Sequence, residues 1–290
     1  MSTSATIDSS WVRLGSVPPT ALGDARLQVH HAVQVAVSAA ISYLPAVPDD
    51  SHTALRWVAP IRALVTELVP ADRPFRIALR PADLSLHALD ATLNVGRSFA
   101  LPGNDVGRAQ EWLGEVAKAA GLDAARLTFR KHYTIPTHAV AEGAAFTLRE
   151  SKGLTELERY WSNTSLLLEE VARDEPTASA VRVWPHHFDI ATLIALPPRT
   201  TAPSRTIGVG HSPGDEWYGE PYWYVSPYPS PPVSSLPPTE IGAWHTTDWI
   251  GAVLTASDYV ADDAVQQQRR VARFVTSAIR ACRQILEDPN

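Results

Sequence analysis

The spacing of apolar residues along the chain predicts four helices. In the first, apolar positions recur at intervals of three and four after Asp24, until Pro45 ends the pattern. The third opens on Thr155-x-x-Glu158, which has the form of a capping box. The expected ranges are 24–44, 104–120, 155–173 and 262–286.

Segments rich in Val, Ile and Leu, bounded by Pro, Gly or Asp, predict strands between these helices. Strands and helices do not alternate strictly, so we expect an α+β fold with an antiparallel or mixed sheet packed by about four helices. The β-rich segments are about residues 54–69, 75–88 and 93–101. Later strands are expected at about residues 127–135, 181–196 with an interruption near Pro185, 207–209, 222–225 and 250–254.

The pattern contains no internal repeat, and we expect a flexible lead-in over residues 1–20 followed by a single α+β domain over residues 21–290. Half of the 24 prolines fall between Pro185 and Pro238. The stretch Ser226–Pro238 is mostly Pro and Ser, and it is not expected to form a helix or a regular strand because proline lacks the amide donor. Its position between aromatic segments predicts an ordered loop over a site.

Composition narrows the class of protein. The chain has 290 residues, of which 45% are hydrophobic, and a formal net charge of −6. Its Lys and Arg residues are scattered, which speaks against a nucleic acid partner. No segment resembles a signal peptide or a membrane span, so we expect a cytoplasmic protein with no membrane contact. The one cysteine, Cys282, lies in an apolar helical pattern and is expected to be an inert core thiol.

Chemically informative residues gather between Val181 and Gly251. Histidines, carboxylates and large aromatic residues are close together there as nowhere else in the chain. Such a mixture is typical of a concave site with apolar walls and a few polar groups. The expected ligand-binding residues are Trp184, Trp217, Tyr222, Tyr224 and Trp244, although aromatic clusters of this kind also form cores.

Several spacings resemble a bacterial family known as domain of unknown function number fifty-nine ninety-six. They are Leu27-x-x-His30-x-x-x-Gln34 on the first helix, His52 after it, Trp112 on a later helix, and the run Ser-Ala-Val-Arg-Val-Trp-Pro-His-His-Phe-Asp-Ile-Ala that ends at Ala191. The resemblance spans about residues 24–285. It implies a fold shared along the chain but carries no activity, and the His186-His187 pair departs from the family's Gly-Ser step.

A divalent metal is one possible cofactor. If residues 181–196 form a strand, His187 and Asp189 point to one face and supply two ligands of a two-histidine, one-carboxylate site. His211 or His245 would complete the set, which makes His187, His211 and His245 the candidate metal ligands. The alternative is that Asp189 orients a buried His187 by a hydrogen bond or caps a neighbouring turn.

General acid–base chemistry is a second possibility, with His187, Asp189, Asp215 and Glu220 as the candidate catalytic residues. Asp215 follows Pro-Gly, so it either acts on a substrate or bonds its own turn. Glu220 is either a buried acid with a raised pKa or a solvent-exposed residue. No Gly-x-Ser-x-Gly elbow is present, so the sequence does not support a serine nucleophile.

Three functions remain open from the sequence. The first is an enzyme acting on a small organic molecule in a pocket formed by residues 184–251. The second is a module that binds a small molecule or a peptide without catalysis. The third is a scaffold in which Trp184, Phe188 and Asp189 brace the sheet. The place of His30 or His52 is also open, since either residue could approach this late motif or be purely structural.

Overall fold

The computed structural model describes residues 10–198 and 204–287, and its chain divides into two compact units. Unit 1 combines Met1–Ala21, Arg159–Val181 and Asp189–Asn290, and unit 2 combines Leu22–Glu158 and Arg182–Phe188. The sequence predicted one domain over residues 21–290. Each unit combines segments that are far apart in the sequence, and no linker marks the boundaries between the units. The division therefore depends on contacts between distant segments.

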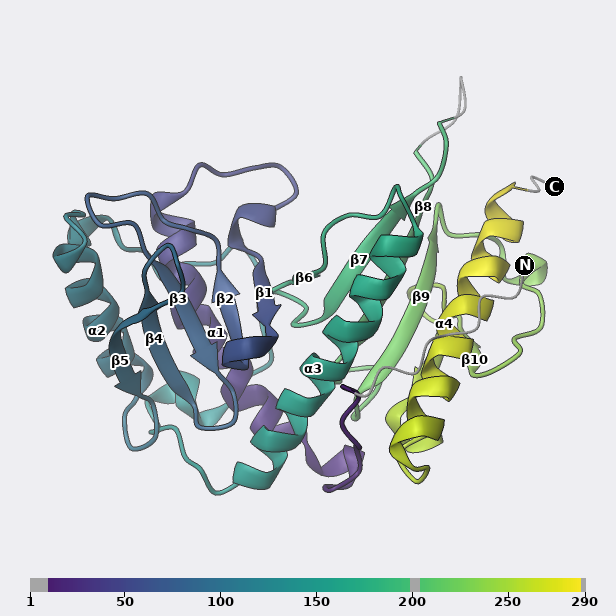
Figure 1. Ribbon diagram of the computed structural model, residues 1–290, viewed down its shortest axis with the longest axis horizontal. Helices are drawn as coiled ribbons and strands as arrows, with labels where there is room; N and C mark the ends of the chain where they lie inside the picture. Colours follow the sequence, from purple (N-terminus) through teal and green to yellow (C-terminus); the bar gives the residue numbers. More distant parts are fainter. Residues whose placement is uncertain (1–9, 199–203, 288–290) are drawn as a thin grey trace. The chain divides into compact units, whose positions relative to one another are not determined.

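Unit 2 contains two complete helices, the first part of α3 (Ser151–Asp174) and six strands. Figure 1 shows them from purple to teal. The helices are α1 (Gly23–Tyr43) and α2 (Val106–Ala119). The strands are β1 (Leu55–Val58), β2 (Ala63–Thr66), β3 (Arg76–Arg80), β4 (Ser85–Leu89), β5 (Val95–Ala100) and β6 (Arg182–Val183). They pair antiparallel in the order β6-β1-β2-β3-β4-β5.

Helix α1 is the buried centre of unit 2. The sequence predicted one apolar stripe, but every residue from Gln28 to Ala40 is buried, including His30 and His31. A helix enclosed on all sides exposes no polar face, so its polar side chains must find partners inside the protein. This requirement explains why its histidines and glutamines form hydrogen bonds with distant segments.

Unit 1 contains five strands and two helical segments. The strands are β7 (Ile190–Ala195), β8 (Thr206–Ser212), β9 (Tyr222–Tyr228), β10 (Ala243–His245) and β11 (Gly251–Thr255), paired antiparallel in the order β10-β11-β9-β8-β7. The helices are α4 (Ala264–Glu287) and the part of α3 (Ser151–Asp174) that follows Glu158. Figure 1 shows α4 lying along β9, where the Cys282 thiol is 3.8 Å from the Val225 carbonyl oxygen.

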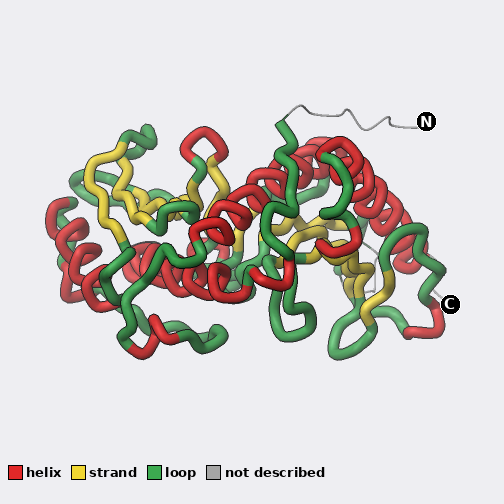
Figure 2. Tube along the Cα trace, turned by 90° about the horizontal axis from the view of Figure 1, so that it is seen from below, coloured by secondary structure: helices red, strands yellow, loops and turns green. Residues whose placement is uncertain are grey.

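Short 3-10 helices and loops connect these elements. The 3-10 helices are Pro19–Ala21, Ser51–Thr53, Ala59–Ile61, Ala124–Arg126, Ala139–Glu142, Val233–Ser235 and Ala256–Asp258. The loops and turns are the green segments in Figure 2. The four predicted helices and the α+β class are confirmed, and no described helix has the length and apolarity that crossing a membrane requires.

Three local predictions were wrong, and one strand was missed. Residues 127–135 form loop rather than a strand. Helix α3 begins at Ser151, so the Thr155 hydroxyl bonds the Ser151 carbonyl inside the helix instead of capping it. Strand β9 continues to Tyr228 through Pro227, because β11 pairs only with residues 222–225 and leaves this end of β9 at an edge. Strand β10 was not predicted.

The lead-in is anchored where the structure describes it. The Gln267 side chain accepts a hydrogen bond from the Leu14 amide and donates one to the Leu14 carbonyl, and the Trp11 ring is buried. The Asn163 side chain bonds both backbone groups of Val12. Hydrogen bonds to Asn163 and Gln267 thus connect residues 12 and 14 to the two helices of unit 1, and the part of the predicted lead-in before Ser10 lies outside the described residues.

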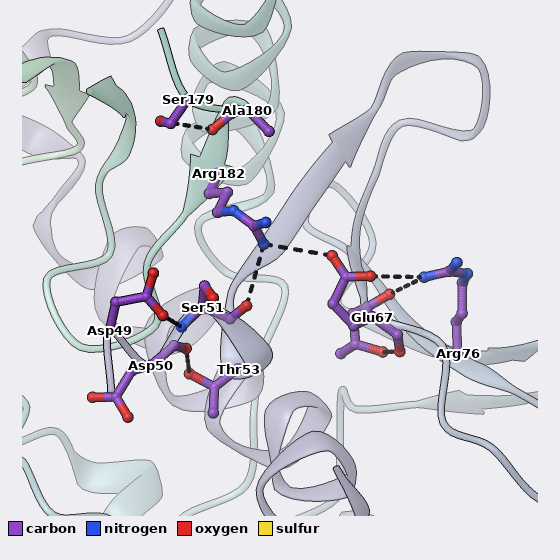
Figure 3. A network of polar contacts seen from close by, with 10 residues as sticks. Asp49, Asp50, Ser51, Thr53, Glu67, Arg76, Ser179, Ala180 and Arg182 are labelled. Atoms are coloured by element: carbon purple, nitrogen blue, oxygen red, sulfur yellow. Dashed lines mark hydrogen bonds and ion pairs between the residues drawn. The ribbon is translucent and has the colours of Figure 1, made fainter. Parts of the chain in front are cut away.

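Strand β6 joins unit 2 through a polar network drawn in Figure 3. The Arg182 guanidinium donates to the Ser51 carbonyl at 3.2 Å and lies 3.6 Å from the Glu67 carboxylate. Glu67 also pairs with Arg76. These contacts hold the short late segment against β1, although more than a hundred residues separate the two in sequence.

Candidate functional site

The Trp-Pro-His-His-Phe motif is a turn, not a strand. The Phe188 amide donates to the Trp184 carbonyl at 2.7 Å, and Phe188 has a φ of 62°. A left-handed backbone at a bulky residue is uncommon and requires support from its surroundings. The expectation that His187 and Asp189 share one strand face was therefore wrong. His187 belongs to unit 2 and Asp189 to unit 1.

This turn is held by α1. The Pro185 carbonyl accepts hydrogen bonds from the His30 Nε2 at 2.9 Å and from the Gln34 Nε2 at 2.8 Å. The His30 ring stacks on Phe188 with centroids 4.6 Å apart. Burial lowers the pKa of His30 to about 3, so the ring is neutral and donates from Nε2. Thus His30, and not His52, meets the late motif within unit 2.

The two motif histidines lie at the surface of this turn. The exposed His187 ring is 4.4 Å from His186, which also contacts Trp184 and Tyr133. Burial, followed by the neighbouring His187, lowers the pKa of His186 to about 4. The ligand-binding candidate Trp184 and the catalytic candidate His187 therefore belong to a histidine and aromatic surface cluster of unit 2.

In unit 1, two candidate carboxylates are bound by tyrosines. The Tyr224 hydroxyl donates to Asp189 Oδ2, and the Tyr222 hydroxyl donates to Asp215 Oδ2, each at 2.5 Å. The other oxygen of Asp215 accepts from the Trp217 and Tyr218 amides, as in an Asx turn. Burial, reinforced by the carboxylate charge, raises the pKa of both tyrosines. In both pairs the tyrosine is therefore neutral and donates its hydroxyl hydrogen to the carboxyl group.

Glu220 is bound at a different place. Its carboxylate accepts from the Ser257 amide at 2.7 Å and from the Ser257 hydroxyl at 2.6 Å. It caps the short helix Ala256–Asp258 in this way, as a carboxylate at a helix N-terminus commonly does. These contacts give Glu220 a structural role at this short helix, and its role as an acid stays a prediction.

An aromatic cluster covers the face of the unit 1 sheet opposite α4. Its members contact one another, with the His245 and Trp249 rings stacked 4.3 Å apart and Tyr218 and Tyr222 4.7 Å apart. Glycines make room for the rings, since a Cβ atom on Gly210 would lie 2.5 Å from Tyr224. The cluster comprises Trp217, Tyr218, Tyr222, Tyr224, His245 and Trp249.

Trp244 does not join that cluster. By register it pairs with Ala252 on the opposite face, where its Nε1 donates to the Pro237 carbonyl at 2.6 Å and its ring lines a groove beside α4. The five aromatic residues predicted to bind one ligand are therefore divided between two faces of one sheet and a turn of the other unit.

The three predicted metal ligands are not brought together either. His211 is fully buried on the face that bears Trp223, packed between Tyr160 and Trp223, whereas His245 lies on the face of the aromatic cluster. Neither His211 nitrogen has a hydrogen-bond partner among the described residues, and burial lowers the pKa of His211 to about 3. No group of three or more His, Cys, Asp or Glu side chains in the described ranges is placed to hold a metal ion.

Unit 2 instead contains a cavity of about 390 Å³ between α1, α2 and the loop that follows α2. Pockets for small organic ligands commonly measure about 300–1,000 Å³. It is lined by His31, Gln34, Val35, Val106, Gln110, Phe129, Lys131, Tyr133, Thr134, Ile135, Thr137 and Ala141.

The polar groups of this cavity are oriented by hydrogen bonds. The Gln34 Oε1 accepts from the Tyr133 hydroxyl at 2.9 Å, while its amide nitrogen holds the Pro185 carbonyl. The His31 Nε2 bonds the Pro136 carbonyl at 3.0 Å, and burial lowers its pKa. A neutral His31 that donates from Nε2 keeps an acceptor nitrogen at Nδ1.

Lys131 supplies the positive charge of the cavity. Burial lowers the pKa of its ammonium, and within the described part of the chain it forms no ion pair. Sequence reasoning missed Lys131 and Tyr133, because residues 127–135 were expected to form a strand. The sequence did single out His30 and Gln34 on the first helix, and these are the side chains that bond the Pro185 carbonyl.

Comparisons of the chain with protein-family models, with curated proteins and with solved structures give no match. The family resemblance stays a prediction, and the function is argued from the geometry of the two units.

Proposed function

We propose that this protein binds a small organic anion in the cavity of unit 2. The observation that carries the proposal is the Lys131 ammonium, which lines a cavity of ligand size without an ion pair in the described chain. A partly buried cation in such a place attracts an anion, because the low-dielectric walls strengthen its field. A carboxylate or a phosphate monoester meets this requirement.

The remaining walls match an organic body. Val35, Val106 and Phe129 supply apolar surface, while Gln110 and Thr134 supply hydrogen-bonding groups. A ligand with an aromatic or aliphatic part and one anionic end would bury its apolar part and place its charge at Lys131. The neutral His31 and the fixed Gln34 and Tyr133 add donors and acceptors without opposing charge.

Binding is favoured over acid–base catalysis by the positions of the candidate carboxylates. Asp189 and Asp215 accept hydrogen bonds from tyrosines, and Glu220 caps a 3-10 helix. Each therefore has a structural task within unit 1. The cavity of unit 2 is formed by histidine, lysine, amide and hydroxyl groups, which suit recognition of an anion.

The test is a thermal-shift and calorimetry screen with small carboxylates and phosphate monoesters, each beside a neutral amide or alcohol of the same shape. Benzoate against benzamide and phenyl phosphate against benzyl alcohol are the first pairs, and they separate the two anion classes. We expect the anionic members to raise the melting temperature of the full chain and the neutral members not to do so.

Three variants make the result specific. Lys131→Met keeps the length of the side chain and removes its charge, and it should weaken binding about tenfold or more, as loss of a charged hydrogen bond does. Gln110→Trp should block binding by filling the cavity. Lys118→Met, on the exposed end of α2, is the matched control and should bind normally. Absence of binding throughout the screen, or equal binding by Lys131→Met, would overturn the proposal.

A further inference from the structure

Four polar side chains form a continuous hydrogen-bonded row on unit 2, away from the cavity. Ser85 and His87 alternate with buried residues on β4, so they share one face of the sheet. Ser98 on β5 lies directly opposite His87 in the register, and Asp83 precedes β4 in the turn. The local structure thus aligns Asp83, Ser85, His87 and Ser98.

The distances in this row are those of good hydrogen bonds. The Ser85 Oγ lies 2.5 Å from Asp83 Oδ1 and 2.8 Å from His87 Nε2. The His87 Nδ1 lies 2.8 Å from the Ser98 Oγ. The two links made by His87 are within the range that a nucleophile and its base require.

Chemistry sets the direction of each bond. A carboxylate only accepts, so the Ser85 hydroxyl donates to Asp83 and its oxygen accepts from His87 Nε2–H. The neutral imidazole then has Nδ1 as its acceptor, and the Ser98 hydroxyl donates to it. Burial, and next the charge of Arg80, lowers the pKa of His87, while Asp83 opposes them. His87 is therefore an unprotonated base at neutral pH.

We propose that Ser98 is a nucleophile for small activated esters, with His87 as its general base and with Ser85 and Asp83 as positioning residues. The arrangement has the order of a serine, histidine and acid triad, with the Ser85 hydroxyl inserted between the imidazole and the carboxylate. Ser98 is exposed on β5, the last strand in the order of unit 2, so an ester can approach it from solvent.

The reaction balances with ester and water alone. The Ser98 Oγ attacks the ester carbonyl carbon and its proton passes to His87 Nδ1. The bond from that carbon to the leaving oxygen then breaks, and the leaving oxygen takes the proton from His87 when its basicity requires it. Where the leaving oxygen departs as an anion, His87 gives its proton to solvent. His87 then takes a proton from water as the water oxygen attacks the acyl carbon. The bond from that carbon to the Ser98 Oγ breaks, the Oγ takes the proton from His87, and the carboxylic acid is released. This site is independent of the anion cavity.

The test is acetylation of the full chain by p-nitrophenyl acetate, followed by p-nitrophenolate release and by peptide mass spectrometry. We expect the acetyl group on Ser98 and no release burst from Ser98→Ala. His87→Gln should slow acetylation about 100-fold, the usual contribution of a general base. Ser234→Ala changes an exposed serine elsewhere and should react normally.

The roles of Ser85 and Asp83 are tested by kinetic constants that would not change if these residues only stabilised the fold. Ser85→Ala and Asp83→Asn should lower the acetylation rate constant with little change in the ester concentration at half-saturation, and Ser85→Thr should restore the rate. Circular dichroism checks that each variant folds. Acetylation that occurs only at other residues, or at an unchanged rate in His87→Gln, would show that the row is an ordinary cross-strand contact and overturn the proposal.

Discussion

The His30 imidazole is nearly parallel to the Phe188 ring, with the centroids 4.6 Å apart and the planes inclined by 4°. One ring comes from the first helix and the other from the late motif. The same helix holds the motif's Pro185 carbonyl through His30 and Gln34. These contacts join the late motif to α1, which agrees with the hypothesis that Phe188 has a structural role.

Truncating the buried member of this stack should be costly. Phe188 is 1% exposed, so Phe188→Ala should destabilise the protein by about 3–5 kcal/mol through the lost burial and the cavity it leaves. The adjacent, exposed His187 is the matched control, and His187→Ala should change stability by no more than about 0.5 kcal/mol. Urea unfolding followed by circular dichroism measures both, and equal losses would contradict the structural role of Phe188.

The Tyr224 and Asp189 pair should show direct energetic coupling. Removing the donor with Tyr224→Phe, or the carboxyl acceptor with Asp189→Asn, should each cost about 1–3 kcal/mol, because the hydrogen bond between these two buried groups is lost or weakened. The double variant should cost less than the sum by at least about 0.5 kcal/mol. Tyr228→Phe, at an exposed position of the same strand, should be neutral. Strict additivity in the double-mutant cycle would rule out the coupling.

Two glycines should respond to alanine in opposite directions. At Gly210 a Cβ atom would lie 2.5 Å from the Tyr224 ring, so Gly210→Ala should destabilise unit 1 by about 1–3 kcal/mol through overpacking. At Gly114, inside α2, a Cβ atom meets nothing within 4 Å, and Gly114→Ala should stabilise by about 0.5–1 kcal/mol. Melting temperatures decide this, and a stabilising Gly210→Ala would contradict the close ring packing.

Replacing the buried His211 should stabilise the protein. Both ring nitrogens lack hydrogen-bond partners among the described residues, so the imidazole is desolvated without compensation. His211→Phe retains ring packing against Tyr160 and Trp223, and it should gain about 1–3 kcal/mol. His211→Ala, which leaves a cavity, is the contrasting variant and should destabilise. Loss of stability in both variants would show that the imidazole itself is needed.

Acid should destabilise the wild type more than His211→Phe. Burial lowers the pKa of His211 and of His30 to about 3 in the folded state, while unfolded histidine titrates near 6.5. The contribution of these two neutral histidines to the free energy of unfolding is therefore complete above about pH 6.5. It is lost as the pH falls toward 3, at up to about 1.4 kcal/mol per pH unit for each residue. Urea unfolding at pH 7 and pH 4.5 should show the smaller loss in His211→Phe. Identical losses would contradict the assigned pKa.

Local pattern was sufficient for the helices and for most of the strands. The apolar spacing and the flanking Pro and Gly residues predict helices close to the observed bounds of α1, α2 and α4, because helix periodicity is a property of neighbouring residues. The alternation of Tyr222 and Tyr224 against Trp223 likewise places them on opposite faces of β9. The same local rules failed at 127–135, where side chains of a strand-like segment line the cavity as loop.

The candidate sites were decided by tertiary structure. The pairing of His87 with Ser98 depends on the register of β4 and β5, and the Lys131 cavity depends on how a loop closes over α1 and α2. The late histidines lie in one stretch of the sequence. Strand alternation and the left-handed backbone of Phe188 nevertheless place their side chains apart. By itself the sequence determined which residues are available and which elements they form. Only packing and register decided which side chains meet, because contacts between distant segments leave no periodic trace in a single chain.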